Sequence, residues 1–223
     1  MPAYVSAAKP YRGLGMAGAV ARWYAALTKK SFEEFVALAR RVADQIPRQS
    51  SVLEVAPGPG YFAIELARLG DYQITGLDIS ETFVEIARAN ARRAGVQVGF
   101  LRGNASAMPF SDGMFDFLVC RAAFKNFGEP ARALEEMQRV LKPGGQALII
   151  DLRRDASIES IKQAVNAMNL GAVNRIMTTL AFRCMLLKRA YTKKEFEGLI
   201  STTKFRRVEI EENPIGLEIL LSA

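Results

Sequence analysis

VLEVAPGPG, residues Val52–Gly60, is the stretch that decides the fold class of this 223-residue chain. A short apolar run leads into a turn of two prolines and two glycines, and a helical pattern follows over Tyr61–Leu69. A glycine-rich turn between a strand and a helix lets a ligand approach the backbone, where the amides of the helix N-terminus point outward. Because proline carries no N–H, Gly58, Gly60 and Tyr61 must supply the donors. The stretch therefore predicts a strand, a ligand-binding turn and a helix in succession.

Short apolar runs alternate with helical patterns on either side of this stretch, which is typical of α/β proteins with a mainly parallel sheet. The runs are continuous rather than alternating, so we expect helices on both faces of the sheet. We therefore expect an α/β fold with a Rossmann-like, doubly wound sheet of about seven strands. It should be mainly parallel, with a helical insertion after strand five and an antiparallel C-terminal strand pair. The expected strands are Ser51–Ala56, Gln73–Asp78, Val96–Leu101, Phe115–Cys120, Gln146–Leu152, Phe205–Glu211 and Gly216–Ser222.

Cap-forming residues mark the ends of the helical patterns. Ser80 can cap one helix, and Gly95 can end it in the left-handed conformation. The turn sequence Lys142–Gly145 (KPGG) is expected to break another. Capping boxes are expected at Ser31 with Glu34 and at Thr192 with Glu195. The expected helices are Phe32–Gln45, Tyr61–Leu69, Glu81–Arg93, Glu129–Leu141, Ile158–Leu170, Ala172–Leu187 and Lys193–Ile200.

The composition excludes several kinds of enzyme. The chain has no histidine, which removes imidazole as a general base or metal ligand and rules out Ser-His-Asp triads. Its two cysteines, Cys120 and Cys184, allow neither a disulfide framework nor a cysteine-based zinc site. We therefore expect no metal ion and a reaction that needs no imidazole.

The net charge of +7 raises the question of a nucleic-acid partner. Residues 1–50 carry eight basic and three acidic side chains, residues 51–150 carry ten and eleven, and residues 151–223 carry twelve and nine. The excess therefore lies in the two flanks. Because no aromatic-interleaved basic stripe accompanies it, we favour solvated helix faces over a nucleic-acid groove.

We expect no membrane-spanning helix, since no run of about 18 apolar residues occurs. The apolar run Leu14–Ala21 is followed directly by Arg22, so we expect an ordinary helix there rather than a secretory leader. Few cysteines and no leader favour a cytoplasmic location.

Asp78 lies 20 residues after Gly58, at the end of the second expected strand, where a carboxylate can accept both hydroxyls of a ribose. These features predict an adenosine-containing ligand. Gly58–Ala63 also satisfies the dinucleotide pattern G-x-G-x-x-G/A, which would favour NAD. Glu54 argues against NAD, because a carboxylate inside an apolar strand needs polar partners or a cationic ligand. The chain after Asp151 also lacks a second mononucleotide-binding half.

Val52–Gly60 resembles the first motif of class I S-adenosylmethionine-dependent methyltransferases. Further motifs of that family follow in order and with similar spacing over about 100 residues. They are Gly76–Ser80 (GLDIS), Gly103–Ala105 (GNA), Met108–Phe110 (MPF), Phe115-Asp116 and Arg139–Gly145 (RVLKPGG).

The resemblance implies contacts to S-adenosylmethionine for residues at the ends of the first four expected strands. Asp78 would bind the ribose and Ile79 the adenine face, while the carbonyl of Cys120 would meet the ammonium group. Ala56 stands where the family has glycine and Asn104 where it has aspartate, although an amide oxygen can still accept the adenine amino group. Asp78 and Asn104 could instead serve as helix-cap and turn residues. The implied cofactor-binding residues are Glu54, Ala56, Pro57, Gly58, Gly60, Asp78, Ile79, Asn104, Ala105 and Cys120.

For the methyl acceptor, the resemblance implicates the segment before the first strand, the loop after the fourth and the insertion. The candidate substrate-binding residues are Tyr24, Arg121, Lys125 and Asn126, and we assign no catalytic base. The loop Arg121–Phe127 is similar to one in quinone-biosynthesis methyltransferases, where an Arg-Asn pair replaces Lys125-Asn126. Apolar side chains of the insertion either line an acceptor site or pack its own helices; they are Met168, Met177, Leu180, Phe182 and Met185. The basic side chains at the same edge either attract a negative group or are simply solvated; they are Arg121, Lys125, Arg153 and Arg154.

The resemblance thus implies a methyltransferase that acts on a small apolar or aromatic molecule, with S-adenosylhomocysteine as product and the acceptor atom undetermined. An RNA methyltransferase and a non-catalytic S-adenosylmethionine-binding protein are the alternatives. No RNA-binding module is recognisable, and neither cysteine follows a proline, as it would in cytosine-5 enzymes. We expect one domain, active as a monomer or homodimer. It comprises an N-terminal helical cap (1–50), a cofactor-binding core (51–152), a helical insertion (153–203) and a C-terminal strand pair (204–223).

Overall fold

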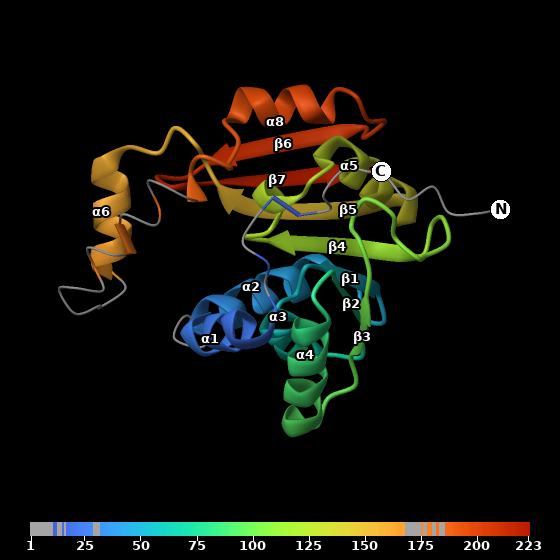
Figure 1. Ribbon diagram of the computed structural model, residues 1–223. Coiled ribbons are helices and arrows are strands. Elements are labelled where there is room, and N and C mark those ends of the chain that lie inside the picture. Colours follow the sequence, from blue (N-terminus) through green and yellow to red (C-terminus); the bar gives the residue numbers. More distant parts are fainter. Residues whose placement is uncertain are drawn as a thin grey trace.

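The computed structural model describes residues 11, 12, 15, 17–28, 32–167, 175, 178, 179, 182 and 186–223. Their centre is a seven-stranded sheet in the order β3-β2-β1-β4-β5-β7-β6 (Figure 1). The first five strands pair in parallel, and β7 is antiparallel to both β5 and β6. The strands are β1 Ser51–Val55, β2 Gln73–Asp78, β3 Gly99–Arg102, β4 Phe115–Arg121, β5 Leu141–Leu152, β6 Arg207–Glu212 and β7 Gly216–Ser222. The expected α/β fold, with its antiparallel C-terminal pair, is confirmed.

Helices cover both faces of this sheet. Side chains of β1 alternate between the faces: Val52 packs with the core formed by α2, α3 and α4, whereas Leu53 and Val55 pack with the core under α5 and α8. This division explains why the strands are apolar on both sides. The helices are α1 Gly18–Thr28, α2 Phe32–Gln45, α3 Tyr61–Ala67, α4 Glu81–Ala94, the 3₁₀ turn η2 Phe124–Asn126, α5 Pro130–Val140, α6 Ile158–Ala167 and α8 Lys193–Ile200.

The strand order indicates at which edge of the sheet a ligand would bind. β1 lies between β2 and β4, so the chain leaves β1 toward one side and later returns on the other. In open α/β sheets, ligands bind at the carboxyl ends of the strands at such a switch point. The turn after β1 lies there.

Local signals placed several elements correctly. Ser80 accepts a hydrogen bond from the backbone N–H of Phe83 and caps α4, which ends at Gly95 with φ 68°. Thr192 and Glu195 form the expected capping box at the start of α8. Ser31 and most of Ala172–Leu187 lie outside the described residues.

Lys142–Gly145 follows the end of α5 at Val140, so the expected break of the helix is confirmed, but these residues do not form a simple turn. These residues belong to β5, which begins directly after α5. Phe115 pairs with Leu141 and Phe117 with Gln146, so the four residues between Leu141 and Gln146 form an irregularity in the strand. Proline and glycine are tolerated at such a bulge, where ladder hydrogen bonds are interrupted.

The insertion after β5 packs a small core of its own. Phe182 contacts a cluster of Ile161, Val165 and Leu187, which favours internal packing over an acceptor site for this side chain. Figure 1 shows α6 standing apart from the sheet. Each helix in the described part of the chain is too short or too polar to cross a bilayer.

Candidate cofactor and acceptor site

The turn after β1 is built from left-handed backbone. Ala56, Gly58 and Gly60 have φ values of 57°, 54° and 77°. A side chain at Gly60 would meet the Phe100 ring at 2.8 Å, whereas one at Gly58 would project into open space. Gly60 is therefore required for packing against the sheet, and Gly58 leaves the backbone open to a ligand.

Asp78 ties this turn to the end of β2. Its Oδ2 accepts the backbone N–H of Gly58 at 3.0 Å and its Oδ1 accepts that of Ser80 at 2.8 Å. Each carboxylate oxygen has a further lone pair for a ribose hydroxyl. Asp78 thus supports the start of α4, as the capping alternative expected, and remains available to a ligand. Burial raises its pKa, although these backbone hydrogen bonds oppose the shift.

Glu54 is the second buried carboxyl group at this edge. It is 3% exposed and accepts the backbone N–H of Ala63 at 3.2 Å. Burial raises the pKa of Glu54 to about 8, and the nearby charge of Asp78 adds to the effect, while Arg121 opposes it. Two buried carboxyl groups at one edge of the sheet disfavour an anionic ligand, whereas a cationic ligand would stabilise their ionised forms.

The remaining cofactor candidates lie at the same edge. Asn104 Oδ1 accepts the backbone N–H of Ser106 at 3.0 Å, so its role as a turn residue is met as well. Ala105 is buried and Ile79 half-buried. Cys120 is fully buried, which raises the pKa of its thiol, and β4 continues for one residue beyond it.

Helix α1 packs against the first turns of α3 and α4, the helices that follow β1 and β2. The rings of Tyr24 and Phe83 meet edge to face at 5.9 Å, and the Tyr61 hydroxyl donates to the carbonyl of Ala25 at 3.1 Å. Tyr24 therefore lies beside α4.

Tyr11 lies against the loop after β4, and sequence reasoning did not single it out. It forms an isolated β-bridge with Phe127, and its pKa is raised mainly by burial. Arg189 and Asp78 are both close enough to influence that pKa. No periodic pattern marks this residue, and the only available signal was an aromatic side chain ahead of the first helix.

In the loop after β4, Lys125 is buried and paired, whereas an exposed cation was expected there. It is 4% exposed, and its Nζ lies 2.7 Å from Asp151 Oδ1 and 2.6 Å from the carbonyl oxygen of Ala122. Asp151 Oδ2 also accepts the backbone N–H of Lys125. The pair fixes the loop to β5 and leaves no free charge on Lys125.

Asn126, the next residue, has a buried side-chain oxygen with no hydrogen-bond partner among the described residues. Its backbone carbonyl accepts the N–H of Arg12 at 2.7 Å. An unpaired buried acceptor is costly, so this oxygen is a candidate contact for a donor group on a ligand.

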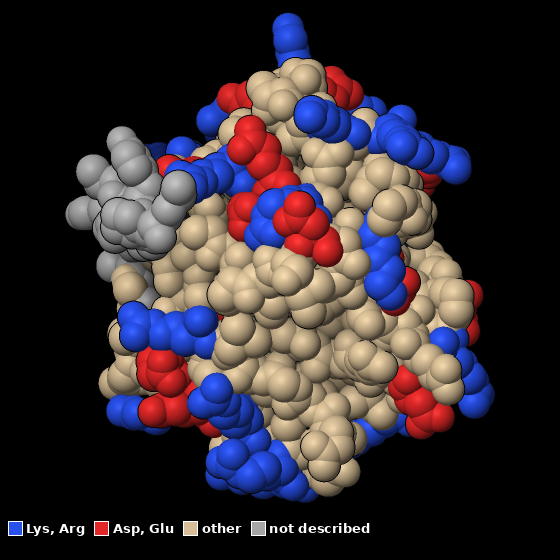
Figure 2. All heavy atoms as spheres, turned by 90° about the vertical axis from the view of Figure 1, so that its right-hand side faces the viewer, with Lys and Arg blue, Asp and Glu red and all other residues tan. Residues whose placement is uncertain are grey.

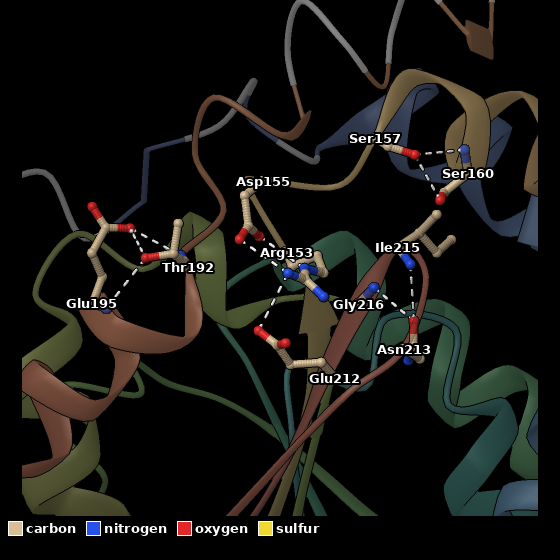
Figure 3. Close-up of polar contacts among 10 residues, drawn as sticks. All are labelled: Arg153, Asp155, Ser157, Ser160, Thr192, Glu195, Glu212, Asn213, Ile215 and Gly216. Atoms are coloured by element: carbon tan, nitrogen blue, oxygen red, sulfur yellow. Dashed lines mark hydrogen bonds and ion pairs between the residues drawn. The ribbon is translucent and has the colours of Figure 1, made fainter.

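The other basic candidates also have acidic partners. Arg121 pairs with Glu34, and its guanidinium lies 4.4 Å from the centre of the Phe35 ring. Arg153 lies between two carboxylates, those of Asp155 and Glu212, at 2.8 and 3.3 Å (Figure 3). Arg154 pairs with Glu195.

The opposite edge of the sheet carries mixed charge. Figure 2 shows basic and acidic side chains interspersed around an uncharged centre, with no broad basic stripe on that face. Among the described residues, no group of three or more acidic or cysteine side chains is arranged to hold a metal ion.

Part of the chain is similar in sequence to known methyltransferases. Residues 53–149 match the family described as a methyltransferase domain. Demethylmenaquinone methyltransferase from Deinococcus radiodurans is 37% identical over 107 residues, which are 48% of this chain and 44% of that protein. The ubiquinone/menaquinone biosynthesis C-methyltransferase UbiE from Escherichia fergusonii is 31% identical over 140 residues, or 61% and 55% of the two chains. The chain spans about half the length of these curated relatives.

Solved structures share the fold. A putative S-adenosyl-L-methionine-dependent methyltransferase from Methanococcus maripaludis superposes with a TM-score of 0.74, 21% identity and coverage of 91% of each chain. The [4+2]-cyclase SpnF gives a TM-score of 0.56 at 22% identity, covering 84% of this chain and 79% of its own. At this identity the likeness shows the fold alone, and the reaction must be inferred from the site.

Proposed function

We propose that this chain carries a class I S-adenosylmethionine-dependent methyltransferase domain and transfers a methyl group from S-adenosylmethionine to a small apolar or aromatic acceptor. S-adenosylhomocysteine is the second product. The family of residues 53–149 and the names of the sequence relatives support methyl transfer.

The observation that carries the cofactor assignment is the pair of buried carboxyl groups, Glu54 and Asp78, which accept backbone N–H groups from α3 and from the turn at Gly58. A cationic cofactor would stabilise the ionised forms of these carboxyl groups, whereas the diphosphate of NAD would place further negative charge beside them. The same residues therefore fit S-adenosylmethionine, which is positively charged at sulfur and at its amino group.

The chain's contribution is to bind and orient. Asp78 would hold the ribose hydroxyls, Asn104 the adenine amino group, and Glu54 with the turn the methionine part. When bound, the cofactor supplies a methyl group on an excellent leaving group, so alignment is the main task of the protein. The other residues proposed for the cofactor are Ala56, Pro57, Gly60, Ile79, Ala105 and Cys120.

For the acceptor, we propose a small aromatic ring of the phenol or quinol kind. The names of the two sequence relatives support this class. Lys125 would act by holding the loop through Asp151, and Asn126 Oδ1 would accept a donor group on the acceptor. Tyr24 and Arg121 would border the acceptor site.

For the location of the protein, we propose the cytoplasm, on the basis of the sequence.

A methyl-transfer screen tests this proposal. The chain is incubated with S-adenosylmethionine labelled in its methyl group and with panels of phenols, quinols, thiols, amines and bulk tRNA. Transfer to phenols or quinols supports the proposed class. Transfer to tRNA alone would replace it with the RNA alternative, and its salt dependence would show phosphate contacts.

A further inference from the structure

A basic cavity lies outside the cofactor edge, between residues 11–12, the end of the insertion and α8. Its volume is about 440 Å³, and four basic side chains and one carboxylate contribute to its lining. The residues that matter here are Arg12, Arg154, Lys188, Arg189, Tyr191 and Glu195. The cations come from both basic flanks of the sequence.

Three of these cations have no acidic partner. Glu195 pairs with Arg154. Among the described residues, the Arg12 side chain donates to two neutral oxygens, the Tyr191 hydroxyl at 3.2 Å and the Gly128 carbonyl at 3.4 Å, and to no carboxylate. Lys188 and Arg189 form no ion pair among the described residues, which include every Asp and Glu of the chain. The cavity therefore holds an uncompensated positive field, in contrast to the paired arginines elsewhere at this edge.

The surroundings hold these groups in place. The rings of Phe124 and Phe196 pack on Tyr191 at 5.8 and 5.9 Å, and the Tyr191 carbonyl accepts the backbone N–H of Arg154. Arg189 and Ala190 donate backbone hydrogen bonds within a turn that closes the insertion. Figure 3 shows that Thr192 and Glu195 fix the adjoining start of α8. A binding site whose groups are held in advance loses less entropy when a ligand binds.

The cavity borders the acceptor loop. Arg12 binds the carbonyls of Asn126 and Gly128 in that loop. Tyr11, next to Arg12, forms a β-bridge with Phe127 of the same loop. The cavity and the loop after β4 are therefore joined through residues 11 and 12.

We propose that this cavity binds a phosphate monoester group carried by the methyl acceptor. A dianion matches the excess of positive charge better than a single carboxylate does, and guanidinium groups fit phosphate oxygens in a bidentate manner. This role in the acceptor rests on the proposed methyl transfer, whereas anion binding by the cavity does not.

Phenyl phosphate is the probe for this site, titrated by calorimetry into the wild-type chain and two double variants. Lys188→Gln/Arg189→Gln removes two unpaired cations from the cavity. Arg92→Gln/Arg93→Gln removes two exposed cations from the end of α4 and is the matched control. We expect the first to weaken binding at least about tenfold and the second less than about twofold, with affinity falling as salt increases. Equal affinity of the cavity variant and the wild type, or equal loss in both variants, would overturn the proposal.

Two further experiments are needed. One distinguishes a phosphate on the acceptor from a lipid headgroup, and the other tests methyl transfer independently of the cavity. Co-sedimentation with phosphatidylglycerol vesicles, without binding of phenyl phosphate, would place the anion in a lipid headgroup and contradict an acceptor phosphate. Titration with S-adenosylhomocysteine, which has no phosphate, should give equal affinity in the wild type and in Lys188→Gln/Arg189→Gln. Absence of S-adenosylhomocysteine binding in the wild type would refute the proposed function and leave the phenyl phosphate result as the test of the cavity.

Discussion

The carboxylate of Asp78 accepts the backbone N–H of Gly58 at 3.0 Å, which joins the carboxyl end of β2 to the turn that follows β1. This one side chain thus shapes the turn, and its carboxylate lies at the carboxyl end of the parallel strands. We therefore expect both the shape of the turn and ligand binding to depend on this residue.

Replacing Asp78 should weaken cofactor binding. Asp78→Ala removes an acceptor for the ribose hydroxyls and an anchor of the turn, and hydrogen bonds to charged groups contribute about 1.5–3 kcal/mol. We expect the affinity for S-adenosylhomocysteine to fall roughly 10- to 150-fold in calorimetry. Asp71→Ala, at an exposed carboxylate just before β2, is the control and should bind as the wild type does. Unchanged affinity in Asp78→Ala would remove this residue from the cofactor site.

Glu54 should make stability depend on pH. Its folded pKa of about 8 lies above the ordinary value of 4.5, so between these pH values the folded state holds a proton that the unfolded state has lost. The free energy of unfolding should therefore fall as the pH rises from about 5 to about 8, by up to about 1.4 kcal/mol per unit. Urea titrations of the wild type and Glu54→Gln measure the slope, which should be shallower in the variant. Parallel curves would show that Glu54 does not hold this proton.

The same group should link cofactor binding to proton release. A cationic ligand near Glu54 favours its ionised form, so binding of S-adenosylhomocysteine, through its amino group, should expel a proton near neutral pH. Calorimetry in buffers of different ionisation enthalpy counts that proton. We expect release in the wild type and none in Glu54→Gln. Equal proton counts in the two proteins would place the ammonium group away from Glu54.

Ala56 offers a test of backbone strain. An alanine in left-handed conformation is strained by about 1–2 kcal/mol, and glycine would remove this strain. Part of that stabilisation is offset, because glycine makes the unfolded chain more flexible and so raises the entropy lost on folding. Ala56→Gly should therefore raise the free energy of unfolding by about 0.5–1 kcal/mol. Ala89→Gly, inside α4, should lower it by about 1 kcal/mol. Destabilisation by both substitutions to the same extent would contradict a strained turn.

Lys125 and Asp151 should act as a unit. Lys125→Met leaves a buried carboxylate unpaired and should cost about 3–5 kcal/mol of stability, while Lys125→Met/Asp151→Leu should recover most of that loss. Urea unfolding of both variants and of Asp151→Leu completes the cycle. Full stability of Lys125→Met, together with a raised KM for the acceptor, would return Lys125 to substrate binding.

Local patterns in the sequence predicted β1, its turn, α4 with its caps and the C-terminal strand pair. Each of these is set by residues close together in the chain, such as Ser80 and Gly95 at the two ends of α4. The position of Asp78 followed from the same logic, because strand periodicity and the distance from Gly58 are both local.

Other features depend on contacts that no local pattern contains. The burial of Lys125 requires Asp151, which lies 26 residues away on the neighbouring strand. Tyr11 reaches the loop after β4 through its bridge to Phe127. The bulge at Lys142–Gly145 reflects the pairing of β5 with β4, because the same proline and glycines would form an ordinary turn in isolation.

The choice of cofactor is tested most directly by calorimetric titration of the wild-type chain with S-adenosylmethionine, S-adenosylhomocysteine and NAD under identical conditions. We predict saturable binding of the first two at one site per chain, and no saturable heat with NAD. Tighter binding of NAD than of S-adenosylhomocysteine would contradict the assignment of this site to a cationic methyl donor.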